Sequence, residues 1–422
     1  MSMIFVRRLG QNYAFVVVAA IFFALLVSAG SRGAPGVLIL PLEDAFGWTR
    51  TQISFAAASG IFLYGLVGPF AVALMDRIGI RKTLMGALAL LSMSMALSLF
   101  ISEPWHLLLT VGVMAGLASG CMAVTLGAYT VNRWFAAHRG LAMGVLTSAT
   151  ATGTLIFVPG MAALASAGGW EYVVTAVAIV PALLIPVIYF FVPERPSAVG
   201  LRRYGATEAD AAPQPSAEGP LQTAISALRM AVRTRVFWYL FATFFICGFT
   251  TNGLVGTHLI ALCGDNGIPE IQAAGLLAMM GVFDLIGTTL SGWLTDRFDP
   301  RKLLFVYYSL RGLSLIYLPF SDFSLYSLTI FAVFYGLDWI ATVPPTLRLT
   351  NEAFGDRKGP IIFGWIVAGH QLGAASAAFF AGTMRSAQGD YLMAFVIAGA
   401  TGLIAAFIAL YIRPGKAPLE PA

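Results

Sequence analysis

The chain has 422 residues, of which 58% are hydrophobic and only 11% are Asp, Glu, Lys or Arg. Soluble domains carry about 25% charged residues, so this composition excludes a soluble enzyme, and the apolar stretches leave too little sequence for a membrane-anchored soluble domain. The net charge of +5 gathers in loops on one side of the predicted helices, which indicates membrane topology rather than a surface for nucleic acid.

Twelve apolar stretches follow one another along the chain, and each is long enough to cross a bilayer as a helix, which takes about 20 residues. Long continuous runs rather than short alternating segments exclude a β-barrel. The first stretch is too long for a signal-peptide core and lacks a small-residue cleavage site, so we expect it to be retained as a helix. The stretches cover residues 13–42, 51–75, 84–101, 107–131, 141–165, 172–192, 236–262, 273–295, 303–320, 325–349, 361–384 and 391–412.

Basic residues give these helices an orientation. Of the 25 Lys and Arg residues, Arg50 and Arg385 lie on one side of the predicted helices, and Arg32, Arg311 and Arg348 lie within apolar stretches. The others lie on the side that carries both termini. Because cytoplasmic loops hold the excess of Lys and Arg, we expect a multi-pass protein of the inner or plasma membrane with both termini in the cytoplasm.

One long connection divides the chain. Residues 194–220 are polar and rich in Pro, Ala and Gly, which predicts disorder, whereas 221–235 alternate apolar and basic residues at helical spacing, as in an amphipathic helix on the cytoplasmic surface. The prediction is an N-terminal six-helix bundle in residues 1–192, a cytoplasmic linker in 193–235, and a C-terminal six-helix bundle in 236–422.

An internal repeat supports this division. The heptapeptide DRIGIRK (76–82) follows the second helix, and DRFDPRK (296–302) follows the eighth, 220 residues later. The same offset pairs Arg32 with Asn252 and Tyr64 with Asp284. Symmetric halves place a binding site between them near the bilayer midplane. The repeat therefore predicts an alternating-access transporter and argues against a simple membrane sensor.

The doubled DRxGxRK turn in a chain of six plus six helices resembles the major facilitator superfamily. The resemblance covers the whole chain and implies an all-α membrane protein of 12 transmembrane helices in two pseudo-symmetric bundles. The sequence departs from the usual motif at Val72 and Asp299, where the family usually has Gly. The resemblance assigns gating at the cytoplasmic face to Asp76, Arg77, Arg81, Asp296, Arg297 and Arg301.

A narrower resemblance lies in two other segments. The sequence NRWFAAHRGLAMG (132–144), together with FGWTR (46–50), is similar to monocarboxylate transporters and oxalate/formate exchangers. Animal monocarboxylate transporters carry an Asp and an Arg four residues apart on helix 8, but here Asp284 is followed by Thr288. The roles of that pair in anion binding and proton coupling cannot both be carried over. Either the Arg is supplied from elsewhere in the chain or the substrate differs.

Five ionisable residues inside apolar stretches are the candidates for a transport site, because a charge at the bilayer centre costs roughly 2.5–3.5 kcal/mol and normally faces the protein interior. Arg32 lies among Gly, Ser and Pro residues, and its guanidinium fits a carboxylate with two parallel hydrogen bonds; a structural ion pair or a snorkelling Arg is the alternative. The candidate substrate-binding residues are Arg32, Tyr64, Asn252 and Arg311.

Other roles stay open for the remaining buried charges. The peripheral helix 9 that carries Arg311 in this superfamily also favours a supporting role, in which Arg311 neutralises Asp284 or Asp338. Asp284, Asp338 and His370 are the candidates for proton coupling, since burial favours the neutral acid and histidine titrates near neutral pH. A permanent ion pair for Asp284 and a structural hydrogen bond for His370 are the alternatives.

Three single cysteines, Cys121, Cys247 and Cys263, form neither a disulfide framework nor a metal spacing. Neither a nucleophile elbow nor a phosphate-binding loop is present, so we expect no enzyme activity, cofactor or metal, and an ion gradient or exchange as the energy source. The sequence predicts a monomeric, proton-coupled carrier of a small organic anion, specifically a monocarboxylate. An efflux carrier for hydrophobic or cationic compounds and an anion exchanger are the alternatives.

Overall fold

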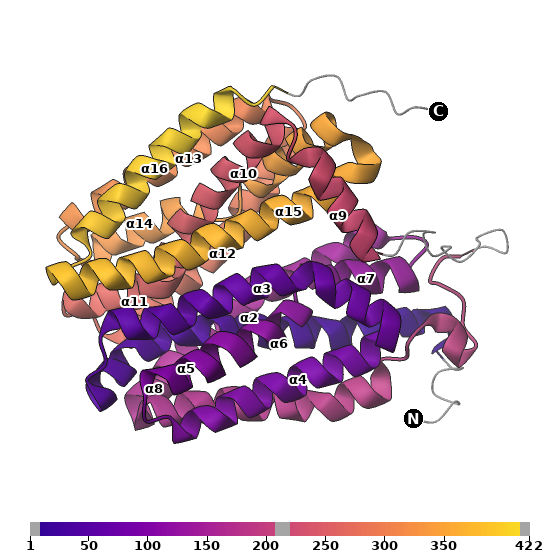
Figure 1. The fold of residues 1–422 in the computed structure, drawn as a ribbon, viewed down its shortest axis with the longest axis horizontal. Helices are drawn as coiled ribbons and strands as arrows, with labels where there is room; N and C mark the ends of the chain where they lie inside the picture. Colours follow the sequence, from indigo (N-terminus) through magenta and orange to yellow (C-terminus); the bar gives the residue numbers. More distant parts are fainter. Residues whose placement is uncertain (1–8, 207–219, 414–422) are drawn as a thin grey trace.

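The computed structural model describes residues 9–206 and 220–413, and this part is almost entirely helical. Figure 1 shows the two halves of the chain side by side, the first in indigo to magenta and the second in orange to yellow. The first half contains η1 (Gly10–Asn12), α2 (Tyr13–Phe46), α3 (Arg50–Ile78), α4 (Ile80–Leu97), η2 (Ser98–Phe100), α5 (Pro104–Leu107), η3 (Leu108–Met114), α6 (Ala115–Cys121), α7 (Val124–Trp134) and α8 (Arg139–Phe191).

The second half repeats this pattern of long helices after a short linker. The linker contains η4 (Pro196–Val199) and α9 (Pro220–Ala231). The helices that follow are α10 (Arg235–Gly248), η5 (Phe249–Val255), α11 (Gly256–Asp265), α12 (Glu270–Thr295), α13 (Pro300–Tyr317), η6 (Leu318–Phe320), α14 (Leu325–Asp338), α15 (Val343–Gln388) and α16 (Leu392–Leu410).

The described helices make the twelve predicted crossings. Eleven stretches are long and apolar enough to span a membrane, and one of them, Ala142–Phe191, has 50 residues. A straight helix of that length would be about 75 Å long, more than twice the roughly 30 Å apolar core of a bilayer. The backbone of α8 is non-helical at Gly168 and Gly169. This stretch therefore crosses twice, turning at the two glycines.

A three-residue turn joins the first two crossings and fixes where α3 begins. Gly47 ends α2 with a left-handed backbone (φ +66°), which glycine adopts without strain. Thr49 then caps α3, because its hydroxyl accepts from the Gln52 amide while the Gln52 side chain accepts from the Thr49 amide. This turn puts Arg50 in the first turn of α3, at what we name the Arg50 end of the molecule. The opposite end, which carries the turns 76–82 and 296–302, is named the basic end.

Small residues allow the two halves to touch. A Cβ on Gly36 of α2 would lie 3.1 Å from the backbone oxygens of Gly256 and Thr257 in α11. A Cβ on Gly65 of α3 would overlap the Gln371 side chain of α15. Close approach of helices in a membrane depends on such small residues. The interface between α2, α3, α11 and α15 is thus packed backbone against backbone.

The linker is more ordered than its composition predicts. The expectation of disorder is wrong for residues 194–206, where η4 forms and the Tyr204 amide donates to the Trp134 carbonyl at 2.8 Å. Residues 207–219, the rest of the segment expected to be disordered, lie outside the described residues, as do the predicted cytoplasmic termini in 1–8 and 414–422. Helix α9 lies against α15, where Trp365 Nε1 donates to the Ala224 carbonyl at 2.9 Å.

Candidate functional site

Arg32 is the ionisable residue inside the membrane region whose charge is least compensated by the protein. It is half-buried in α2, and its guanidinium carbon lies 4.2 Å from the centre of the Tyr64 ring of α3, as in a cation–π contact. Among the residues that the structure describes, no carboxylate lies within ion-pair distance of Arg32. An aromatic face attracts a cation but does not neutralise it, so the guanidinium keeps its hydrogen-bonding edge for another anion.

The register of the helices places Arg32 and Asn252 at the same level. Arg32 lies four residues before Gly36, and Asn252 lies four residues before Gly256, where α2 and α11 are in backbone contact. Four residues are about 6 Å along a helix. Both side chains therefore border the contact between the halves, one turn towards the basic end. The repeat offset that pairs these two positions in the sequence also pairs them in space.

Asn252 belongs to a stretch in which the helix is locally widened. The segment Phe249–Val255 is a π-helical turn, a feature that is frequent at functional sites. The turn is held from the neighbouring helix α14, because the Tyr335 hydroxyl donates to the Thr250 carbonyl at 2.5 Å. Asn252 is therefore presented from a supported irregular segment rather than from a regular helix.

Gln371 is a residue of this region that the sequence did not single out. It is 9% exposed, it touches Gly65 next to Tyr64, and its amide makes no hydrogen bond within the described part of the chain. A buried amide without partners costs free energy unless something else satisfies it. The signal in the sequence was a polar amide inside an apolar stretch, directly after His370.

Arg311 forms an ion pair inside the second half. Its Nε lies 2.8 Å from Oδ2 of Asp338, and its terminal nitrogens donate to Cys247 Sγ at 3.0 Å and to the carbonyls of Asp338 and Trp339. Arg311 is 1% exposed. Of the two predicted partners, Asp338 is thus the one it contacts, and the mutual neutralisation of Arg311 and Asp284 is wrong. Arg311 has its bonds satisfied within the protein, so it is not in contact with a central site.

Asp284 is held by neutral donors instead. Its Oδ1 accepts from the Thr288 hydroxyl at 3.0 Å and from the Ile340 amide at 2.9 Å. Thr288 stands where the resembled carriers have Arg, and it supplies a hydrogen bond without a charge. The carboxyl group is 5% exposed, so its bonds are those of a buried group that the protein stabilises without a salt bridge.

Two further polar atoms beside this cluster have no hydrogen-bond partner in the described residues. They are Oδ1 of Asp338 and Nδ1 of His370, and both are buried. The His370 ring lies 5.1 Å from the ring of Phe244 on α10. Unsatisfied buried polar atoms are rare in proteins, and here they belong to two of the three residues that the sequence marked for proton coupling.

The six residues predicted to act as gates are placed at the basic end. In the first half, Asp76 accepts from Tyr129 at 2.9 Å and from Arg133 at 2.8 Å, while Arg81 donates to the Val192 carbonyl at 2.7 Å. In the second half, Arg301 pairs with Asp299 at 2.6 Å, and Arg297 lies over the Trp293 ring. These contacts stay within one half. For Arg77 and Asp296 the structure shows exposed or open positions at the two turns.

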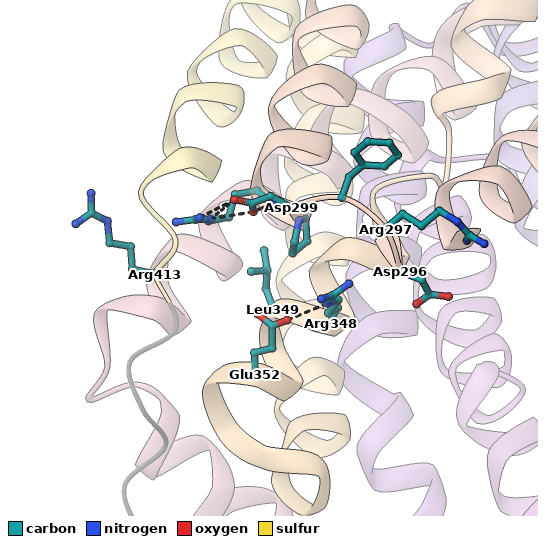
Figure 2. Close-up of a pocket in the computed structure, with 10 residues that line it drawn as sticks. Asp296, Arg297, Asp299, Arg348, Leu349, Glu352 and Arg413 are labelled. Carbon is teal, nitrogen blue, oxygen red and sulfur yellow. Dashed lines mark hydrogen bonds and ion pairs between the residues drawn. The ribbon is translucent and has the colours of Figure 1, made fainter. Parts of the chain in front are cut away.

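A cavity of about 510 Å³ lies at the basic end, within the second half. Figure 2 shows Arg348 facing Glu352 and Arg413 directed away from the other lining side chains. The Arg301 guanidinium holds the pKa of Asp299 in its wall below the usual value. Because α12, α13, α15 and the end of α16 supply its whole lining, this cavity is not the shared site that symmetric halves predict. In the described residues no cluster of His, Cys, Asp and Glu could hold a metal ion.

Comparison with known proteins agrees with this architecture. The model of the Major Facilitator Superfamily matches residues 21–359 and, in a second match, 259–422. The uncharacterized MFS-type transporter YcxA of Bacillus subtilis (strain 168) is 26% identical over 387 residues, which are 90% of each chain. Monocarboxylate transporter 13 of Rattus norvegicus is 26% identical over 393 residues, covering 92% of this chain and 86% of the relative.

Solved structures of transporters share the fold. A bacterial homologue of the human lysosomal transporter Spinster has a TM-score of 0.74 at 16% identity, with 96% of this chain and 99% of that chain covered. The D-xylose–proton symporter has a TM-score of 0.74 at 15% identity, with 96% and 98% covered. At such identities the likeness concerns the fold, and the residues of the site have to be judged on their own contacts.

Proposed function

The chain belongs to the major facilitator superfamily and is a multi-pass membrane transporter, and we propose that it carries a small organic anion, specifically a monocarboxylate, by proton-coupled alternating access. The observation that carries this proposal is the half-buried guanidinium of Arg32, which has no carboxylate partner among the described residues. A cation inside a membrane protein needs a counterion. A substrate carboxylate supplies one, and it fits a guanidinium with two parallel hydrogen bonds.

The proposed substrate site lies between the halves. Arg32 and Tyr64 come from the first half, and Asn252 and Gln371 come from the second. In this arrangement the guanidinium binds the carboxylate, the Tyr64 ring holds the guanidinium in place, and the two amides supply hydrogen bonds that a short carboxylic acid with a polar substituent would use. A ligand that contacts both halves can favour the conformations in which they close around it.

Access to this site is proposed from the basic end. The contact of α2 with α11 lies one turn beyond Arg32 towards the Arg50 end and blocks approach from there. By the distribution of Lys and Arg the basic end faces the cytoplasm, so the structure corresponds to an inward-facing carrier in the plasma or inner membrane. We expect the gating turns 76–82 and 296–302 to engage each other in the opposite, outward-facing state.

Proton coupling is assigned to the second half. Asp338 carries a buried oxygen without a donor, Asp284 is bonded by neutral donors, and His370 has an unpartnered ring nitrogen. Adding a proton to Asp338 would satisfy its charge and loosen its ion pair with Arg311, which changes the packing around α14. The proposal is that this change accompanies substrate binding at Arg32.

The test compares substrate binding and uptake in Arg32→Ala, Arg32→Lys and the exposed control Arg233→Ala. Purified protein in proteoliposomes receives labelled pyruvate, lactate or acetate under an imposed pH gradient, and binding is measured separately by calorimetry. Loss of a charge-assisted bidentate contact should weaken binding by about 10- to 150-fold in Arg32→Ala. We expect Arg32→Lys to recover part of it and Arg233→Ala to match the parent.

Unchanged carboxylate affinity in a folded Arg32→Ala variant would remove Arg32 from the site. An efflux carrier for hydrophobic or cationic compounds was the alternative that buried acids supported. Asp338 is now seen in an ion pair and Asp284 in a bonded pocket, so neither offers a free carboxylate to a cationic substrate. A lipophilic cation is included in the uptake assay, and its transport in place of carboxylates would favour that alternative.

A further inference from the structure

Four charged side chains meet at the Arg50 end, where the halves are in contact. Arg50, which is 4% exposed, places Nη2 2.6 Å from Oδ1 of Asp265 and Nη1 2.7 Å from Oδ2, a bidentate pair. Its Nε lies 2.8 Å from Glu43. Arg385 contacts the same Asp265 carboxylate at 2.7 Å. Two acids and two bases therefore form one neutral cluster, which we name the Arg50 cluster.

The cluster divides evenly between the halves. Glu43 and Arg50 belong to α2 and α3 of the first half, whereas Asp265 and Arg385 belong to α11 and α15 of the second. Each half thus holds one acid and one base that already contact each other. The Arg50–Asp265 pair is the link across the boundary, and it is the pair with two parallel hydrogen bonds.

A hydrogen-bond chain anchors the link within the second half. Arg50 Nη1 donates to the Tyr391 hydroxyl at 3.2 Å, and that hydroxyl lies 3.0 Å from Nδ1 of His258. Nε2 of His258 lies 2.8 Å from the Ala378 carbonyl. Because a carbonyl only accepts, Nε2 carries the proton, and Nδ1 accepts from Tyr391. Every group in the chain is satisfied only while Arg50 stays docked.

The helix ends argue that these charges are placed for each other. Arg50 opens α3, and Glu43 and Asp265 lie in the last turns of α2 and α11. Cations are unfavourable at helix N-termini and anions at C-termini, because the helix dipole opposes them. Three of the four charges therefore stand at ends that disfavour them, which local helix stability does not explain.

We propose that the Arg50 cluster is the gate of the Arg50 end, built so that each half keeps its own counterion when the gate opens. Separating the halves breaks Arg50–Asp265 but leaves Glu43–Arg50 and Asp265–Arg385 intact. An uncompensated charge, the costly outcome of breaking an ion pair, does not arise. This inference rests on the alternating access of the proposed function and concerns which residues set its conformational equilibrium.

The proposal predicts opposite effects from residues of one cluster. Removing a member of the link, with Arg50→Gln or Asp265→Asn, takes away bonds that only the closed gate makes and should favour opening. Removing an internal counterion, with Glu43→Gln or Arg385→Gln, should favour closure. Glu43 competes with Asp265 for Arg50, and Arg385 competes with Arg50 for Asp265, so loss of either competitor strengthens the link.

The experiment measures the distance between the halves at the Arg50 end by pulsed electron paramagnetic resonance. Spin labels are introduced in Ala167→Cys, next to the bend of α8, and in Phe320→Cys, at the end of η6; both positions are exposed. The parent without introduced cysteines is labelled in parallel to measure the background from the native thiols. Asp299→Asn, which removes an ion pair confined to the basic end, is the matched charge control.

A second background keeps both directions measurable. Gly382 of α15 faces α3, and a Cβ there would overlap Ser54 and lie 2.8 Å from the Arg50 carbonyl. Gly382→Ala should therefore wedge the gate partly open without changing any charge. In this background we expect Arg50→Gln and Asp265→Asn to raise the ratio of long to short distances by about tenfold, and Glu43→Gln and Arg385→Gln to lower it by a similar factor.

Effects of the same sign for all four variants, or no effect, would overturn the gate assignment. The distances need no substrate, so this outcome is separate from the proposed function. If the distances shift as expected but no carboxylate is taken up, the gate stands and the proposed substrate class fails. If Arg32→Ala abolishes carboxylate binding while the distances ignore the Arg50 cluster, the reverse conclusion follows.

Discussion

At the scale of single residues, the protein treats its intramembrane charges in three different ways. Arg311 and Asp338 neutralise each other, Asp284 is stabilised by neutral donors, and Arg32 is left to an aromatic ring. The sequence identified all these positions, because a charge in an apolar stretch is conspicuous. It did not settle the pairing, since Asp284 and Asp338 are both reachable from Arg311 by helix register, and only the packing of α13 against α14 selects Asp338.

The Arg311–Asp338 pair should be strongly non-additive. Arg311→Leu and Asp338→Asn each leave one buried polar group uncompensated and should each lower the free energy of unfolding by about 3–5 kcal/mol, whereas the double variant should cost less than their sum. The measurement is a double-mutant cycle on thermal unfolding in detergent. The exposed pair Arg348–Glu352 is the control and should couple by about 0–1 kcal/mol. Additive losses at Arg311 and Asp338 would show that the pair does not stabilise the fold.

At the scale of elements, the apolar runs predicted the helices well because a membrane span must satisfy its backbone internally. The linker was the failure. Its Pro, Ala and Gly content indicated disorder, yet Tyr204 pairs its backbone with that of Trp134 and packs its ring against Phe15 and Phe135. That contact joins residues far apart in the sequence, and composition carries no signal of it.

The repeated turn shows why one copy of the motif keeps a glycine and the other does not. Gly79 has φ +95° and so requires glycine, whereas Asp299, 220 residues later, has φ −62° and is open to any residue. Asp299 uses its side chain to cap α13, accepting from the Arg301 amide at 2.9 Å before Pro300 starts the helix. The departure from the motif is therefore a helix cap rather than a lost function.

The cap should give the second turn a pH-dependent stability. The Arg301 side chain lowers the pKa of Asp299 in the folded protein, so its stabilisation is complete above the unfolded pKa of about 3.9 and is lost as the pH falls through the folded value. Asp299→Ala should cost about 1 kcal/mol at neutral pH. Thermal unfolding of parent and Asp299→Asn between pH 7 and pH 3 checks this. Identical pH profiles for the two proteins would contradict it.

At the scale of the whole molecule, the site arises from the repeat. The offset of 220 residues paired Arg32 with Asn252 in the sequence, and the two lie one turn from the contact of α2 with α11. The sequence could not show which end of the molecule is closed, because both states use the same helices and hydrophobic surfaces. That information lies in long-range contacts such as Arg50 with Asp265, whose two residues are separated by more than half the chain.

The coupling of protons to transport is a property of the whole cycle, and it predicts a split between two assays. If Asp284, Asp338 or His370 carries the proton, neutralising that residue should abolish uphill uptake but spare counterflow. Exchange requires only that the loaded carrier reorients, whereas net symport also requires the empty carrier to release its proton and return. Asp338, with its unpartnered oxygen, is the first choice, and breaking its pair with Arg311 gives protonation a structural effect.

The comparison uses Asp284→Asn, Asp338→Asn and His370→Gln in proteoliposomes, with labelled pyruvate, in counterflow without a pH gradient and in accumulation driven by one. We expect Asp338→Asn to keep counterflow and to lose accumulation by at least about tenfold, a barrier of roughly 1.4 kcal/mol or more. Because Asp338→Asn also destabilises the bundle, each rate is normalised to the folded fraction, and Glu352→Gln in the exposed pair serves as control. Accumulation that survives in all three variants would exclude symport through these residues, and an anion exchanger would then be the better description, since an Arg32 site binds carboxylates whether or not a proton follows.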